Sequence, residues 1–171
     1  MGLKVHTFHT DLLSMMDAIN LSDEVKQSSL DADVLIMPVG HKGAPFAFAR
    51  CASDLYQYLC DNGVKTEILC DDENFEEIEL NSKVIRLGKI LVKSAVLPIA
   101  LSVLANYVTD AIKTDKKDDQ LVEFVSPAEL NVEIEVVDSL GAKETITIEY
   151  KGYAKDFPAI SAEIEKLWNE H

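Results

Sequence analysis

A glycine-flanked loop holds the side chains best placed for chemistry. Its residues are Gly40, His41, Lys42 and Gly43. The loop follows the apolar run Asp33–Val39 and directly precedes a segment, from Ala44 onward, with helical spacing of apolar residues. Glycines permit tight backbone geometry, a helix N-terminus presents unpaired N–H groups, and lysine adds positive charge. The loop therefore predicts a binding site for a small anion or a phosphate group.

A second strand end adds to this crevice in the predicted sheet. The strand Val64–Cys70 is followed by Asp71 and Asp72, and ligands of parallel sheets collect outside the carboxyl ends of the strands. We assign Asp72 to the same site. If the two strands are neighbours, Cys70 faces His41, and a nucleophile and its base need such proximity. A buried core thiol is the other interpretation of Cys70, and the sequence favours it.

Motifs of the common enzyme classes are absent from the chain. The loop matches neither GxxxxGK[ST] nor GxGxxG, and the patterns GxSxG and HExxH do not occur. His6 and His9 form HxxH, but residues three apart on a strand point to opposite faces. The three cysteines lack CxxC spacing, which argues against a zinc ribbon or a disulfide framework. We therefore expect no metal and no cofactor, and favour a non-catalytic role.

A strand–helix–strand unit positions the loop. The continuous apolar run Asp33–Val39 predicts a strand buried on both faces. Helical spacing predicts a helix over Ala44–Cys60 that stops at Asn62 and Gly63, and the strand Val64–Cys70 follows. The length of the unit is typical of a parallel βαβ crossover. Three segments precede it: a short strand Val5–His9, an amphipathic helix Asp11–Leu21 and a polar connection Ser22–Ala32.

The segment Val84–Ile112 is the most apolar part of the chain. No charge occurs from Ser94 to Thr109, and apolar residues lie all around the helical wheel. This run is shorter than the ~20 residues of a membrane span and contains Pro98, so we expect a core helix that is at least roughly three-quarters buried along its middle turns. Membrane insertion is the alternative. The same helix is expected to supply an interaction surface, formed by Leu97, Leu101, Leu104 and Tyr107.

The C-terminal segments predict a hairpin and a closing helix. Strict alternation of apolar and polar residues over Leu130–Val136 and Thr145–Tyr150 is typical of two half-buried strands. A helix starts near Asp156, with Pro158 in its first turn.

The elements together predict an α/β fold. It comprises a small sheet with a parallel βαβ core, a long apolar helix, and a C-terminal β-hairpin plus helix. The hairpin is expected to join the sheet antiparallel or to form its own layer. The charged linker Lys113–Gln120 separates an α/β core, residues 1–112, from a ββα unit, residues 121–171, which packs on the same core.

The order of elements from Val84 to Trp168 resembles small accessory components of bacterial conflict or defence effectors. The resemblance covers an apolar helix, a charged linker, a hairpin and a closing helix, and it rests on this order rather than on signature residues. It implies an accessory role in such a system.

Composition limits the classes of partner. The chain has 171 residues, 47% of them hydrophobic, and a net charge of -14. Nucleic acid is a poor partner for so acidic a chain. No basic run followed by an apolar stretch marks the N-terminus, so we expect a cytoplasmic protein. We predict a non-catalytic protein-binding or regulatory module that binds a protein partner or a second copy of itself. The alternative is an enzyme or sensor that binds a small anionic ligand at Gly40–Gly43.

Overall fold

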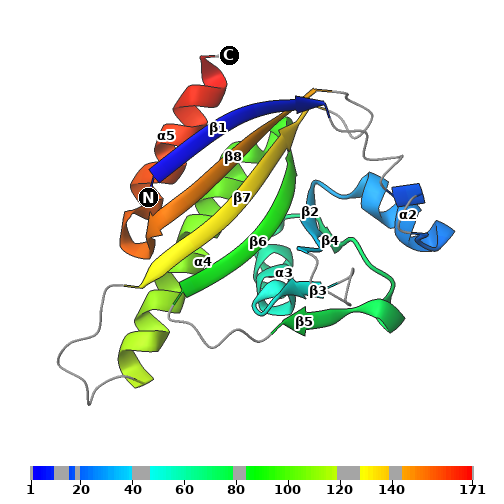
Figure 1. The fold of residues 1–171 in the computed structure, drawn as a ribbon, viewed down its shortest axis with the longest axis horizontal. Helices are drawn as coiled ribbons and strands as arrows, with labels where there is room; N and C mark the ends of the chain where they lie inside the picture. Colours follow the sequence, from blue (N-terminus) through cyan, green and yellow to red (C-terminus); the bar gives the residue numbers. More distant parts are fainter. Residues whose placement is uncertain are drawn as a thin grey trace.

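A six-stranded mixed sheet forms the centre of the fold (Figure 1). The computed structural model describes residues 2–9, 16–17, 20–39, 47–78, 84–118, 128–138 and 144–170. In spatial order, the strands are β1 (Gly2–His9), β8 (Glu144–Tyr153), β7 (Glu129–Val137), β6 (Val84–Lys93), β2 (Val34–Met37) and β4 (Thr66–Ile68). A second, parallel sheet pairs β3 (Ala47–Ala49) with β5 (Glu76–Ile78).

Within the described ranges, four helices accompany the sheets. They are α2 (Asp23–Asp31), α3 (Ala52–Asp61), α4 (Leu97–Asp118) and α5 (Phe157–Asn169). Three short 3-10 turns are η1 (Asp72–Asn74), η2 (Ser94–Val96) and η3 (Ala154–Asp156). The predicted α/β class is therefore confirmed. The predicted helix Asp11–Leu21 falls mostly outside the described residues. Of the residues in this range that the structure describes, Met16 and Asp17 are helical.

The predicted parallel βαβ unit is confirmed. Strands β2 and β4 pair in parallel, and α3 lies between them in the sequence. A second unit of the same kind was not predicted: β6 and β7 also pair in parallel, with α4 as the crossover. The hairpin of β7 and β8 is antiparallel, as predicted, but it joins the sheet through the parallel pairing of β7 with β6. The expectation of an antiparallel junction or a separate layer was wrong.

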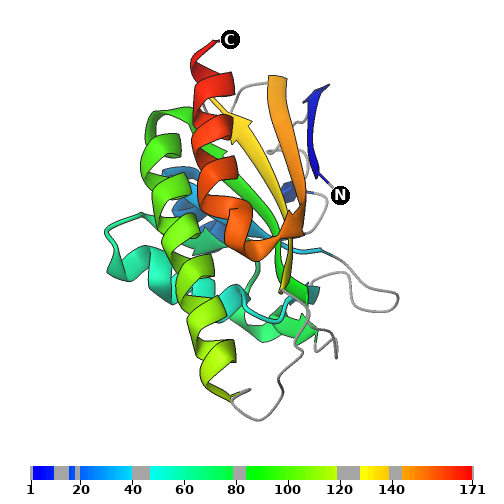
Figure 2. The same ribbon diagram turned by 90° about the vertical axis from the view of Figure 1, so that its left-hand side faces the viewer.

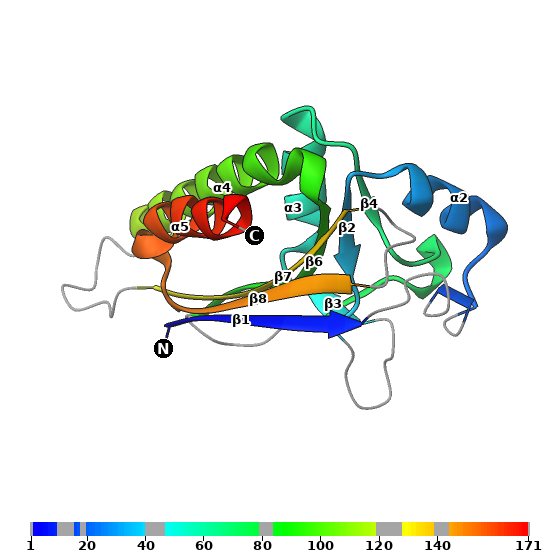
Figure 3. The same ribbon diagram turned by 90° about the horizontal axis from the view of Figure 1, so that it is seen from above.

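Helices α4 and α5 lie side by side over one face of the sheet, here called the helix face (Figures 2 and 3). Alternate residues of β7 point into this layer, and Leu130 and Ile134 are fully buried. Pro158 stands in the first turn of α5, as predicted, and Phe157 and Ile164 are fully buried. The closing helix therefore covers the hairpin together with α4.

The N-terminal third of the predicted apolar helix is a strand. Residues Val84–Lys93 form β6, and the helix begins only at Leu97. An apolar run of this kind has no periodicity that separates a buried strand from a buried helix. Pro98 occupies the first turn of α4, where proline is well tolerated, so it starts the helix rather than interrupting it. The resemblance to accessory components of defence effectors assumed that the segment starts with a helix, whereas the structure has the strand β6 before that helix.

Helix α4 is buried on one side and exposed on the other. The segment Ser94–Lys113 is long and apolar enough to cross a membrane, with a mean hydropathy of 1.6, and 44% of that window is buried. Ile99, at 58% exposure, lies on the outer side with Ser102 and Asn106. In the middle turns of the helix, from Ala100 to Val108, only Ser102 and Asn106 are exposed, so the predicted burial of at least three-quarters is confirmed there. The helix also continues through Lys113–Asp118, so most of the predicted charged linker is helical.

Two further segments differ from their predictions. Ala47–Ala49, expected at the start of a helix, is the strand β3, because it pairs with β5 and buries Phe48 against Phe75 at 5.1 Å between ring centroids. Ser22–Ala32, expected to be a connection, contains α2. The Ser22 hydroxyl caps this helix by accepting from the Val25 N–H at 3.4 Å.

Candidate functional site

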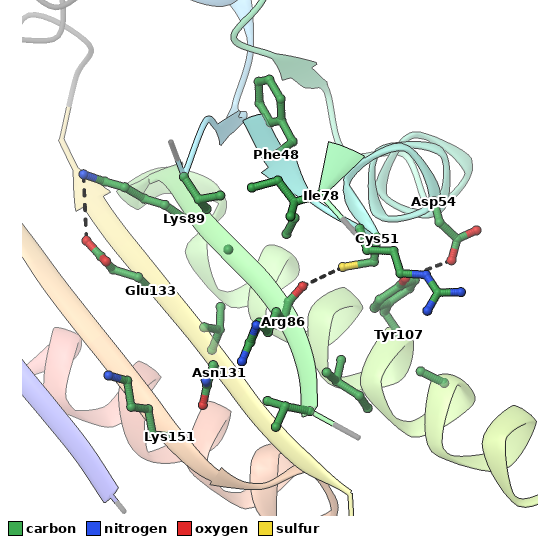
Figure 4. Close-up of a pocket in the computed structure, with 18 of the residues that line it drawn as sticks. Phe48, Cys51, Asp54, Ile78, Arg86, Lys89, Tyr107, Asn131, Glu133 and Lys151 are labelled. Atoms are coloured by element: carbon green, nitrogen blue, oxygen red, sulfur yellow. Dashed lines mark hydrogen bonds and ion pairs between the residues drawn. The ribbon is translucent and has the colours of Figure 1, made fainter. Parts of the chain in front are cut away.

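A cleft of about 860 Å³ opens where β2 ends and β6 continues beyond it (Figure 4). One side is formed by the sheet face that points away from α4 and α5, here called the polar face. The other side is formed by β3, the start of α3 and one turn of α4. Its charged lining residues are four cations and three carboxylates, namely Arg50, Arg86, Lys89, Lys151, Asp54, Glu133 and Glu149. The cleft is therefore rich in positive charge for a chain of net charge -14.

Three neighbouring strands contribute a row of nitrogen-bearing side chains, here called the cationic row. Arg86 of β6 is in register with Asn131 of β7, and Asn131 is in register with Lys151 of β8. Strands lie about 4.8 Å apart, so the row spans roughly 10 Å. Figure 4 shows the three side chains on the same side of the sheet. Within the described part of the chain, neither Arg86 nor Lys151 forms an ion pair.

A β-bulge gives β6 its arrangement of cations. The register with β7 shifts between Arg86 and Gly88. Arg86 and Lys89 are three residues apart, yet both line the cleft, because their partners Asn131 and Glu133 are only two apart. A regular strand would send the two side chains to opposite faces.

Gly88 makes this bulge possible. Its φ is +73°, a conformation that other residues rarely adopt, and a Cβ there would lie 3.1 Å from Val39 Cγ1 and 3.3 Å from Ala49 Cβ. The bulge therefore brings the end of β2, the strand β3 and Arg86 together.

Cys51 ties this part of β6 to α3. Its thiol donates to the backbone oxygen of Arg86 at 2.9 Å. Burial raises the pKa of the Cys51 thiol to about 11, and the nearby carboxylates of Asp54 and Glu77 act in the same direction. The thiol is therefore protonated at neutral pH. A nucleophilic cysteine needs the opposite shift, so Cys51 positions the arginine backbone and does not supply a thiolate.

Tyr107 and Asp54 form the wall beyond the edge of β6. The Tyr107 hydroxyl donates to Asp54 Oδ2 at 2.8 Å. Burial raises the pKa of Tyr107, and the neighbouring Cys51 and the hydrogen bond to Asp54 add to the effect. The Tyr107 ring also packs edge-on against Tyr58 at 5.2 Å between centroids. This wall is therefore neutral at the phenol and rigidly held.

A second row, here called the carboxylate row, lies two residues farther along the strands. Glu133 of β7 and Glu149 of β8 are directly opposite each other. The Lys89 Nζ atom of β6 lies 3.8 Å from Glu133 Oε1 but only 2.6 Å from Glu135 Oε1. Glu135 is a largely buried residue two positions farther along β7. Like charges directly opposite on neighbouring strands destabilise a sheet. Lys4 of β1 is directly opposite Glu149, so the carboxylate row has a lysine on the neighbouring strand at each end.

The residues that directly precede the predicted loop in the sequence line this cleft. Gly40, His41, Lys42 and Gly43 lie outside the described residues. Pro38 and Val39, which directly precede them, line the cleft. Asp72 is exposed in η1 and does not line it, so the structure does not place Asp72 in this site. Cys70 is buried, and its thiol donates to the Asp71 backbone oxygen at 3.1 Å, as a core thiol would.

The four residues assigned to an interaction surface are covered by the chain itself. Leu97, Leu101 and Leu104 are at most 2% exposed and pack in the core between α4 and the sheet. Tyr107 is 6% exposed and lines the cleft. None of the four is at the surface. Binding of a protein partner stays a prediction, but these side chains do not supply the surface for it.

The sequence analysis missed the cationic row. Composition carried one signal: the chain has only two arginines, Arg50 and Arg86, and both line the cleft. Arginine is suited to anion recognition because its planar guanidinium offers paired donors. The contributions of Asn131 and Lys151 depend on strand register, which no local pattern reveals.

Metal ligands and known relatives give no further assignment. Across the described ranges, no group of three or more histidine, cysteine, aspartate or glutamate side chains is placed to hold a metal ion. No family model, curated protein or solved structure matches the chain. The site geometry therefore carries the functional argument.

Proposed function

We propose that this protein is a small-molecule-binding regulatory module whose ligand is an anion held in the cleft. The observation that carries the proposal is the cationic row. Arg86 and Lys151 point into one cleft without carboxylate partners in the described structure, and Asn131 stands between them. The sequence suggested, as an alternative, a small anionic ligand at Gly40–Gly43. The site proposed here takes the same class of ligand but lies on the polar face of the sheet.

Electrostatics supports an anion in this position. The chain has 30 acidic and 16 basic residues, so a basic side chain is expected to have a carboxylate partner nearby. Two cations without such a partner in one cleft therefore favour an external anion. Charge-assisted hydrogen bonds to a guanidinium and an ammonium are stronger than neutral ones. The adjacent apolar side chains Phe48 and Ile78 line the upper part of the cleft, which suits the non-polar body of a small molecule.

The chemistry of the wall favours binding over catalysis. Cys51 and Tyr107 are the groups closest to a nucleophile and an acid, and the pKa of each is raised by burial. Both are protonated at neutral pH, and both are engaged in hydrogen bonds within the protein. We therefore propose a binding role without a reaction, in agreement with the absence of catalytic motifs in the sequence.

A thermal-shift screen tests the proposal. The probes are pyrophosphate, sugar phosphates, nucleoside phosphates and dicarboxylates, each compared with sodium chloride at equal ionic strength. A probe at about ten times its Kd stabilises the folded state by roughly 1.4 kcal/mol, which corresponds to about 3–6 °C in a chain of this size. Arg86→Gln and Lys151→Gln should abolish the shift.

Lys166→Gln is the matched control. Lys166 is exposed on α5, on the helix face of the sheet, and its substitution removes one positive charge without touching the cleft. The shift should persist in this variant. A screen without a shift, or a shift that survives Arg86→Gln and Lys151→Gln, contradicts the proposal.

We further propose, from the sequence, that such a module acts in the cytoplasm through a protein partner or a second copy of itself. The resemblance to accessory components of bacterial defence effectors is compatible with that role. Size-exclusion chromatography with light scattering, with and without a binding anion, tests self-association. The molar mass of the eluting protein should change when the anion binds. A monomer under both conditions contradicts self-association.

A further inference from the structure

We propose that two copies of this chain form a symmetric dimer through the outer edge of β1, so that one sheet continues across both copies. The inference rests on the self-association in the proposed function, and not on the anion site. It starts from the position of β1 at one end of the strand order, next to β8. Figure 1 shows β1 along the outer edge of the sheet. An edge strand presents its backbone N–H and C=O groups to any strand that aligns beside it.

The two edges of the sheet differ in how they are protected. The opposite edge is β4, which has only three residues. Short edge strands, prolines and bulges are devices that prevent pairing between edges. By contrast, β1 has eight residues, contains no proline and pairs with β8 without a shift of register. Its one lysine, Lys4, has Glu149 of β8 opposite it as a counter-charge. Strand β1 is therefore long and regular enough to accept a further strand.

Val5 leaves the apolar layer incomplete at this edge. Its partner on β8 is Ile148, which is 3% exposed in the core of the helix face, whereas Val5 is 43% exposed. Leu3, two residues earlier on the same face, is partly buried against that core. A further strand with apolar residues on this face would extend the layer and cover Val5. The β1 strand of a second copy carries such residues.

A twofold axis at Val5 makes the edge self-complementary. Opposite residues of an antiparallel pair share a face, so Val5 meets its own copy and Leu3 meets Thr7 on the helix face. On the polar face, Lys4 meets His6. An axis at Lys4 would place two lysines directly opposite each other, which is destabilising, and an axis at His6 would separate the two valines. A slip by one residue would mix the apolar and polar faces. The axis at Val5 is therefore the favoured register.

Charge also favours this edge as the meeting point of two copies. Each chain has a net charge of -14, so two copies repel each other over much of their surfaces. None of the eight residues of β1 is acidic. Two such strands can therefore approach each other without placing carboxylates face to face.

Cysteine variants of the full chain test the register. Opposite Cα atoms of an antiparallel pair are about 4.5–5.5 Å apart, a separation that a disulfide can span. With diamide as the oxidant, Val5→Cys should form a disulfide-linked dimer by itself. Lys4→Cys and His6→Cys should each stay largely unlinked and form a linked dimer when they are mixed. Ile99→Cys, at an exposed apolar position of α4, is the matched control and should stay at the wild-type background.

Molar mass tests the dimer without a covalent bond. Light scattering during size-exclusion chromatography, with and without a binding anion, should give twice the mass of one chain in at least one condition. Val5→Lys should weaken the dimer by about tenfold or more, because it places two ammonium groups opposite each other at the axis. Ile99→Lys, which adds the same charge on α4, should dimerise like the wild type.

The outcomes separate this interface from the function beneath it. A dimer that resists Val5→Lys, or a Lys4→Cys variant that links to itself as readily as Val5→Cys, would overturn the β1 interface and leave self-association standing. A wild-type monomer in both conditions, at every concentration up to the solubility limit, would overturn the interface and self-association together. The anion site is tested separately by Arg86→Gln in the thermal-shift screen, and none of these results changes it.

Discussion

The two faces of the central sheet differ in what their residues do. On the helix face, β7 presents Leu130 and Ile134, which are fully buried in the core that also contains residues of α4 and α5. On the polar face, the intervening Asn131 and Glu133 line a cleft and are only half-buried. One strand therefore stabilises the fold with alternate residues and leaves the others for recognition. Substitutions on neighbouring positions of β7 should have very different effects.

The largest expected effect is on the helix face. Ile134→Ala removes methyl and methylene groups from a site that is 0% exposed, and should lower the free energy of unfolding by about 2–5 kcal/mol. Glu133→Ala, one residue away, should change it by at most about 0.5 kcal/mol, because Glu133 is half-buried with a weak ion pair. Urea unfolding measures both. Similar losses at the two positions would break the comparison between the faces.

The next effect concerns the wall where the cleft meets the core. The folded-state pKa of Cys51, about 11, exceeds its ordinary value of 9.0, so the folded state holds this proton more tightly. Its contribution to stability is complete below pH 9 and is lost as the pH rises through 11. Between pH 8 and pH 11 the free energy of unfolding should fall by about 2 kcal/mol more in the wild type than in Cys51→Ala. Equal falls in the two proteins would show that Cys51 is not held as described.

A smaller effect is expected on the carboxylate row. Glu149→Gln relieves the repulsion with Glu133 but also removes the charge that faces Lys4 of β1, so the two contributions oppose each other and the free energy of unfolding should change by less than about 0.5 kcal/mol. Glu163→Gln, exposed on α5, is the control and should have an effect near zero. A change of more than about 1 kcal/mol in either direction would show that one of the two contacts dominates this row.

The smallest expected effect concerns membrane binding, which should be absent. We expect no flotation of the protein with liposomes at physiological salt, because the apolar residues Leu97, Leu101 and Leu104 are packed inside the chain. The outer side of α4 shows Ile99 beside polar Ser102 and Asn106, which is a poor surface for a bilayer. Ile99→Lys should behave like the wild type. Quantitative flotation of the wild type would place α4 in a membrane and contradict its role as a core helix.

Predictability from sequence follows the kind of burial that each element has. The hairpin of β7 and β8 was predicted because each strand has one buried and one accessible face, which produces strict alternation. The strand β6 was not predicted, because its apolar residues Ile90–Val92 are followed almost without interruption by the apolar residues of α4. Only the short turn η2 separates the two elements, and it contains neither glycine nor proline.

Of the cleft, only the strand end beside it could be predicted from the sequence. The end of β2 was recognised by the buried run before it, and Pro38 and Val39 do line the cleft. The cationic row could not be deduced, because Arg86 and Lys151 are brought together by the pairing of three strands. The bulge at Gly88 adds a change of register that depends on contacts with Val39 and Ala49, far away in sequence.

The two arginines allow the most direct test of the anion site. Because the chain contains only Arg50 and Arg86, the guanidinium Nε–H region of a ¹⁵N-correlated NMR spectrum holds two signals, and Arg50→Lys assigns them. On titration with pyrophosphate at constant ionic strength, we expect the Arg86 signal to shift and saturate, with accompanying shifts at the amides of Asn131 and Lys151. Arg86 and both amides unmoved at a concentration of pyrophosphate that stabilises the protein would contradict the account.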